Sequence, residues 1–272
     1  MGQKAVPGPG GRTAGRDGSA RARRAEPRAR LGRAFTAPPT GSATGGVVLV
    51  LPSGEPVSHR RPSPVAYARV LPLARALARS GAAEGLVVHV VHYGRRGWNG
   101  TDAQLAADAE WAAEEVVRRY GDVPICLAGH GMGGRAALHA AGHSAVNSVL
   151  AMAPWLPERD RAVEPEPVGQ LAGRHVLIMH GTNDRRSDPE LSYRLAARAK
   201  KINRDVCRFE VHSDGHALRQ HPAEVLALAR DFVLGALLSR AYSRPVADAL
   251  AAPPPLGLRM PLAAGFGRSI RG

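Results

Sequence analysis

Six short apolar runs alternate with helix-like segments along the middle of the chain. The runs cover residues 47–51, 86–93, 123–129, 146–154, 174–181 and 206–212. Runs of this length with apolar residues at successive positions are typical of strands buried on both faces. Between and after them, apolar residues recur at three- and four-residue spacing. This spacing predicts helices over residues 65–81, 101–121, 132–142, 189–201 and 222–238.

This alternation indicates the fold class. Strands joined through helices run parallel, because each crossover returns the chain to the same edge of the sheet. We therefore expect an α/β fold with a mostly parallel central sheet of six strands and helices on both faces. In such sheets the active crevice lies beyond the carboxyl ends of the strands. Residues that directly follow a strand are thus the candidates for function.

The composition outside these elements sets the domain boundaries. Residues 1–44 are rich in Gly, Pro and Arg and lack periodicity, which predicts a disordered basic tail. Residues 46–239 form the predicted domain, with a short irregular excursion at 155–173. Residues 240–272 return to a Pro-, Ala- and Arg-rich composition and are predicted to be a second tail.

The net charge of +14 raises the question of a nucleic-acid partner, and its distribution along the chain bears on the answer. Residues 1–40 contribute +7 and residues 240–272 contribute +4, so the 199 residues between them carry only +3. Basic tails attract phosphate, but these tails have hardly any aromatic residues on which bases could stack. We expect no nucleic-acid partner despite the basic tails.

Cysteine content and hydropathy suggest a location. Two cysteines, Cys126 and Cys207, are too few for a disulfide framework and fit a reducing compartment. No apolar run reaches the roughly 18 residues of a membrane helix, and the first residues lack the apolar core of a secretion signal. We expect a cytoplasmic protein with no membrane partner.

Three of the predicted strands are followed by residues of types that are common in catalytic sites. Residues 129–133, which read GHGMG, join a strand directly to a helix. Asp184 follows the strand at 174–181, and His216 follows the last strand. The order along the chain is glycine-rich turn, acid and histidine, with separations of 53 and 32 residues.

This arrangement resembles the α/β-hydrolase family of esterases and lipases. That family has a nucleophile elbow, Gly-X-Ser-X-Gly, followed along the chain by an acid and a histidine. The resemblance covers residues 46–239 and implies that Asp184 and His216 form a hydrogen-bonded pair with the histidine as a general base. It also implies a short lid at residues 155–173.

The sequence departs from the family at the centre of the elbow. Gly131 stands at the nucleophile position, and a glycine has no hydroxyl with which to form an acyl-enzyme. The amide of Met132 occupies the position of one oxyanion-hole donor. Pro52 has no amide hydrogen, so the second donor is predicted to be Gly54. Ser53, Trp98 and Arg96 are candidate pocket-lining residues, although Trp98 and Arg96 have helix packing as an equal alternative.

A substitute nucleophile or a metal site has weaker support from the sequence. Cys126 lies inside a strand, where we expect it to be buried and inert, and nothing in the sequence around Ser53 activates its hydroxyl. His139 and His143 have a metal-binding spacing but no third ligand. We expect no metal and no cofactor.

Two functions remain open from the sequence. One is an impaired or unconventional ester hydrolase that uses His216 as a base. The alternative is a pseudoenzyme that binds a small acyl or ester-like ligand without turnover.

Overall fold

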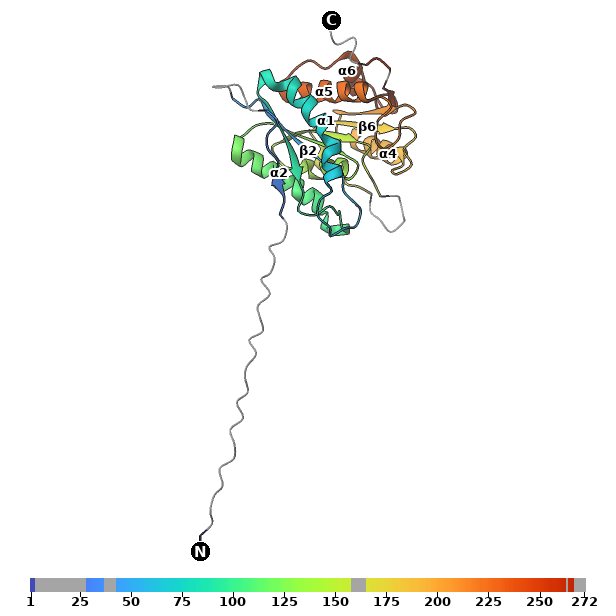
Figure 1. Ribbon diagram of the computed structural model, residues 1–272. Helices are drawn as coiled ribbons and strands as arrows, with labels where there is room; N and C mark the ends of the chain where they lie inside the picture. The colour runs from blue at the N-terminus through green and yellow to red at the C-terminus, as the bar shows by residue number, and fades with distance from the viewer. Residues whose placement is uncertain (3–27, 37–42, 158–164, 263, 267–272) are drawn as a thin grey trace.

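The computed structural model describes residues 1–2, 28–36, 43–157, 165–262 and 264–266. Their strands form one sheet in the order β1-β3-β2-β4-β5-β6-β7-β8 (Figure 1). These strands are β1 (Arg30–Leu31), β2 (Gly46–Leu51), β3 (Leu86–His92), β4 (Ile125–His130), β5 (Val146–Met152), β6 (His175–Gly181), β7 (Val206–Val211) and β8 (Met260–Pro261). All neighbouring pairs are parallel except β1 with β3. The predicted mostly parallel α/β fold is confirmed.

Helices cover both faces of the sheet, as Figure 1 shows. They are α1 (Pro64–Gly81), α2 (Gln104–Tyr120), α3 (Met132–His139), α4 (Pro189–Lys200), α5 (Pro222–Leu238) and α6 (Arg244–Ala251). Short 3-10 turns lie at η1 (Ala82–Glu84), η2 (Gly100–Asp102), η3 (Ala140–Gly142), η4 (Gly169–Leu171) and η5 (Leu256–Leu258).

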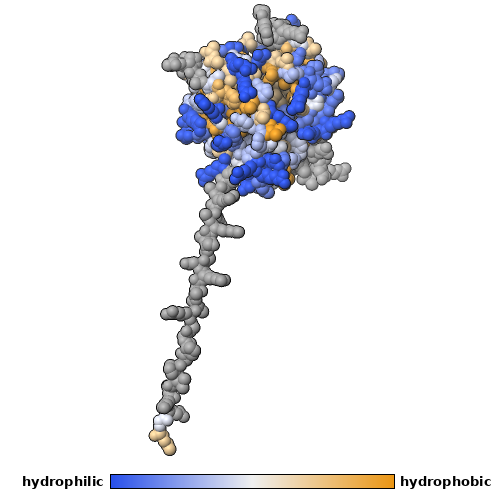
Figure 2. Space-filling model, viewed as in Figure 1, coloured by the Kyte–Doolittle hydropathy of each residue, from blue (hydrophilic) through white to orange (hydrophobic). Residues whose placement is uncertain are grey.

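The core consists of two apolar layers, one on each face of the sheet. Alternate β2 residues point into opposite layers, so Leu49 belongs to the layer that includes residues of α2, α3 and α4, while Val50 belongs to the layer that includes residues of α1, α5 and α6. On the face visible in Figure 2, apolar residues are interspersed with hydrophilic ones. None of the described helices is both long and apolar enough to cross a membrane.

The two predicted tails contribute structure, which the sequence analysis did not foresee. In the first tail, β1 pairs with the edge strand β3, and the amides of Gly32 and Phe35 donate to β3 carbonyls. In the second tail, α6 and β8 form, and β8 pairs with β7 at the other edge. Two-residue strands are too short to show periodicity, yet they cover sheet edges that would otherwise be open. Residues 3–27 and 37–42 lie outside the described residues.

One predicted helix start is wrong. Thr101 lies in the 3-10 turn η2, and α2 begins only at Gln104, after Ala103 in a left-handed conformation. The side chain of Asn99 organises this turn, because its Nδ2 donates to Gln104 Oε1 while its Oδ1 accepts from the Ser58 amide. Asp188 caps the start of α4, since its carboxylate accepts from the amide of Glu190.

Candidate active site

A sharp turn joins β4 to α3 at the carboxyl end of the sheet. Gly131, at its centre, has φ 57° and ψ −121°, a conformation that residues with side chains adopt only under strain. A Cβ on Gly129 would stand 2.1 Å from the carbonyl oxygen of Gly133, and one on Gly133 would stand 2.2 Å from that of Leu51. Glycines at 129 and 133 therefore let α3 start directly against β4 and β2.

Asp184 follows β6 and is the most strongly held polar residue of the site. Its buried carboxylate accepts hydrogen bonds from the amides of Arg186 (2.8 Å) and Ser187 (3.2 Å). Nδ1 of His216 lies 2.8 Å from Oδ2 and must be the donor, because an ionised carboxylate only accepts. Burial alone would raise the pKa of Asp184, but the hydrogen bonds from His180, His216 and Arg186 outweigh it and hold that pKa far below its usual range.

His216 is oriented by this bond. Because Nδ1 donates to Asp184, Nε2 is the acceptor atom of the neutral ring. Nε2 lies 3.2 Å from the point at which a Cβ on Gly131 would stand. The acceptor nitrogen of the imidazole is thus directed at the centre of the elbow.

His180 is a residue of this site that the sequence analysis missed. It is fully buried on β6, and its Nε2 lies 3.1 Å from Asp184 Oδ2 and 3.1 Å from the carbonyl oxygen of Ser187. Both of these atoms are acceptors, so Nε2 carries a hydrogen and donates to them. The sequence offered one weak indication of this role: His180 lies inside an apolar strand, where a buried polar residue needs a hydrogen-bond partner. We call Asp184, His180 and His216 the acid–histidine side.

His130 links the elbow to His216. Its Nε2 lies 2.6 Å from the backbone carbonyl oxygen of His216 and therefore donates to it, and the two rings meet edge to face at 4.9 Å. Burial, which is the largest cause, and the nearby His216 together lower the pKa of His130 to about 4. His130 is therefore neutral at pH 7 and fixes the backbone of the loop that carries His216.

Ser53 lies at the place where an elbow side chain would project. It belongs to the loop after β2, and its Oγ stands 2.6 Å from the point of a Cβ on Gly131. The amide of Met132 donates to this oxygen at 3.4 Å. We call Ser53, Gly131 and Met132 the elbow side.

The remaining predicted residues lie around the elbow side. Gly54 follows Ser53 and is packed so closely that a Cβ would stand 2.5 Å from the carbonyl oxygen of Arg96. Arg96 pairs with Glu55 at 3.1 Å and thus ties the loop after β3 to the loop after β2. Trp98 is 4 % exposed, and the guanidinium of Arg135 on α3 lies 3.9 Å from the centre of its ring. The ring of Trp98 therefore packs against α3.

The two cysteines are unsuited to nucleophilic chemistry. Both are fully buried in the sheet. Burial raises the pKa of each thiol to about 12, so neither forms a thiolate at neutral pH. The predicted lid region at 155–173 includes residues 158–164, which lie outside the described residues.

The structure is similar to solved α/β serine hydrolases and esterases. XC6422 from Xanthomonas campestris, described as an α/β serine hydrolase without lid, is 17 % identical, with a TM-score of 0.53 over 76 % of this chain and 89 % of that one. Est1E from Butyrivibrio proteoclasticus is 13 % identical, with a TM-score of 0.55 over 78 % and 94 %.

A Pyrobaculum calidifontis esterase is 17 % identical, with a TM-score of 0.54 over 77 % of this chain and 87 % of that one. No protein-family model and no curated protein sequence matches this chain. At such identities structural similarity establishes architecture and leaves chemistry to the site. The sheet order, the elbow and these neighbours together show that the chain has the α/β-hydrolase fold.

Proposed function

We propose that the protein is an unconventional carboxylic-ester hydrolase in which His216, held by Asp184, acts as a general base on a hydroxyl that does not belong to residue 131. The observation that carries this proposal is the pair itself. Nδ1 of His216 bonds to Asp184 at 2.8 Å while Nε2 lies 3.2 Å from the Cβ position of the elbow residue. A base oriented in this way can remove a proton from an attacking hydroxyl.

The surroundings of the pair support a working base. Four groups hold the carboxylate of Asp184: two backbone amides and the side chains of His180 and His216. The carboxylate therefore stays ionised at neutral pH, and it stabilises the imidazolium that forms when His216 accepts a proton. The histidine is also partly open to solvent, with 16 % of its side chain exposed.

The elbow side supports attack on an acyl group. The amide of Met132 is at the start of α3, where the positive end of the helix dipole favours a developing negative charge. We propose that Met132 and Gly54 supply the amides for the oxyanion of a small ester. The absence of an elbow hydroxyl at Gly131 is then the reason that the mechanism differs from that of an ordinary serine esterase.

Hydrolysis of p-nitrophenyl acetate and p-nitrophenyl butyrate tests the proposal. The purified protein should turn over one of these esters, and His216→Ala should lower kcat by about 100-fold or more, the usual contribution of general-base catalysis. His143→Ala is the control, because His143 lies beyond the far end of α3. If His216→Ala has the same rate as the parent protein, the proposal is wrong.

A second candidate function is that of a pseudoenzyme that binds a small acyl or ester-like ligand. The observation in its favour is that Ser53 already accepts the amide hydrogen of Met132, which a substrate carbonyl would otherwise use. Butyrate at millimolar concentration should then raise the thermal unfolding temperature while neither ester is hydrolysed. The cytoplasmic location stays a prediction for either function.

A further inference from the structure

We propose that Ser53 is the nucleophile of this site, so that the catalytic hydroxyl comes from the loop after β2 and not from the elbow. This inference rests on the proposed ester hydrolysis and names the hydroxyl on which His216 acts. It would make the chain a covalent hydrolase with a displaced serine.

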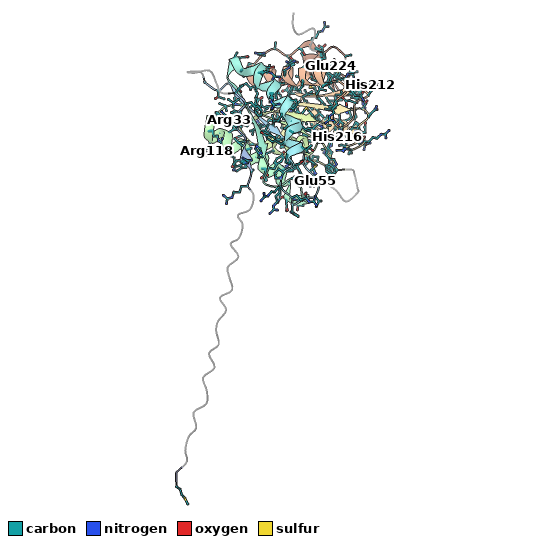
Figure 3. The ribbon with its side chains drawn as sticks, viewed as in Figure 1. Arg33, Glu55, Arg118, His212, His216 and Glu224 are labelled. Atoms are coloured by element: carbon teal, nitrogen blue, oxygen red, sulfur yellow. The ribbon has the colours of Figure 1, made fainter. Side chains whose placement is uncertain are left out.

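The fold places Ser53 beside the elbow through backbone packing. Strands β2 and β4 are neighbours, and Leu51 at the end of β2 pairs with Gly129 at the end of β4. Gly133 in the first turn of α3 lies directly against the carbonyls of Leu51 and Pro52. The residue that follows Pro52 therefore has little freedom to move away from Gly131. In Figure 3, His216 lies near the middle of the folded domain, and Glu55 lies below it near the lower edge of the domain.

The hydroxyl of Ser53 lies close to the base of the site and to an amide that is proposed to bind the oxyanion. Its Oγ lies 3.4 Å from the amide nitrogen of Met132. A single point, the Cβ position of Gly131, lies 2.6 Å from that Oγ and 3.2 Å from His216 Nε2. Among the described residues no hydrogen bond joins Ser53 to His216, but catalytic hydrogen bonds are often long before substrate binds. Because Oγ accepts from Met132, its own hydrogen remains for donation to the imidazole.

Gly131 and Ser53 fit each other as a pair. A Cβ on residue 131 would stand 2.6 Å from Ser53 Oγ, closer than two such atoms can approach without a shift. A serine at the elbow would thus compete with Ser53 for the same space. In this reading the glycine at 131 makes room for the hydroxyl of Ser53.

The reaction balances with an ester and water alone. Ser53 Oγ bonds to the ester carbonyl carbon, the carbonyl electron pair moves to oxygen, and the hydroxyl proton passes to His216 Nε2. The bond to the alkoxy group then breaks, and the proton on Nε2 goes to the departing alcohol, which leaves an acyl-Ser53. A water adds to the acyl carbon, and its proton passes to His216. The bond to Oγ then breaks, and that proton returns to Ser53 as the carboxylic acid departs.

Covalent labelling of the intact protein tests the assignment without dependence on any variant. A fluorophosphonate reagent should modify the parent protein, and peptide mass mapping should locate the adduct on Ser53. His216→Ala should lose the label, because an unactivated serine reacts slowly. Label that maps to another residue would overturn the assignment.

Kinetics of variants complete the test. Ser53→Ala should lower kcat for p-nitrophenyl butyrate by about 100-fold or more, as loss of a nucleophile does. Ser58→Ala is the matched control, because this serine lies in the same loop but its hydroxyl contacts Arg60 and Arg96. Thermal unfolding verifies that both variants fold.

The outcomes separate this inference from the proposed function. If Ser53→Ala keeps the parent rate while His216→Ala loses it, the nucleophile is water, so the inference fails and the proposed function stands. If the parent protein neither hydrolyses the esters nor takes the label, both fail. Loss of rate and label in Ser53→Ala, with Ser58→Ala unchanged, supports the inference.

Discussion

The acid–histidine side and the elbow side of the site follow the family pattern to different degrees. On the acid–histidine side, the acid and histidine stand where the family pattern expects them and are hydrogen-bonded at 2.8 Å. On the elbow side, the turn has the backbone geometry of an elbow, but residue 131 is a glycine, and Ser53 Oγ lies 2.6 Å from its Cβ position.

The difference shows which parts of such a site depend on backbone and which on a side chain. The turn is set by close packing at Gly129 and Gly133, and this packing does not depend on a side chain at residue 131. The base needs a network of partners, and every partner of Asp184 is still in place. The nucleophile needs only one hydroxyl at the right point, and a neighbouring loop can supply one.

The largest expected effect comes from breaking the acid–histidine side at Asp184. Asp184→Asn should lower kcat for p-nitrophenyl butyrate by about 100-fold to 10,000-fold, because His216 loses its orientation and the charge that stabilises its protonated form. Steady-state rates at pH 7 measure this change. A loss of less than about 3-fold would show that the pair does not act in catalysis.

The next effect concerns His130, which connects the two sides. Its pKa in the folded protein is lowered from 6.5 to about 4, so only the unfolded chain takes up a proton between these values. Stability should therefore fall as the pH drops from about 6.5 to 4, by up to about 3 kcal/mol from this group.

His130→Gln keeps a hydrogen-bond donor and removes the titration. Urea unfolding at pH 7 and pH 4.5 should show a smaller loss of free energy of unfolding in this variant than in the parent. Equal losses in the two proteins would contradict the assignment of this pH dependence to His130.

A smaller expected effect is the loss of stability when a side chain is added at Gly131, next to Ser53. Gly131→Ala should cost about 1–3 kcal/mol in free energy of unfolding because of its positive φ, with a further cost from the contact with Ser53 Oγ. Gly100→Ala is the matched control, since Gly100 has φ 64° but no heavy atom within 4 Å of its Cβ position. Urea unfolding should show the larger loss for Gly131→Ala; equal losses would mean that Ser53 moves aside freely.

The smallest expected effect comes from a change at Asp188, four residues after Asp184 in the chain. Asp188→Ala removes the side chain that caps α4 and should cost about 1 kcal/mol in stability. Ester hydrolysis should stay at the parent rate, in contrast to Asp184→Asn. Thermal unfolding and steady-state rates measure both quantities, and a large loss of activity would show that the cap positions Asp184.

Most of the architecture could be predicted from the chain. The six long strands and five of the helices were visible because buried parallel strands leave continuous apolar runs and amphipathic helices leave a periodic signal. The strands β1 and β8 were not, because two residues carry no period and their pairing is decided by the open edges of the sheet. The start of α2 was placed too early, because the turn before it depends on the contacts of Asn99.

The fold class follows from the alternation of strands and helices along the chain, and Asp184, His216 and Gly131 follow from local patterns at strand ends. The contact of His180 with the acid, the bond from His130 to the histidine loop and the position of Ser53 beside the elbow appear only once the chain is folded. These three contacts join residues on different strands or loops, or depend on the orientation of a buried side chain. The spacing of residues along the chain predicts neither the long-range contacts nor the side-chain orientation. Ser53 and Gly131 are 78 residues apart, and they meet only because β2 and β4 pair side by side in the sheet.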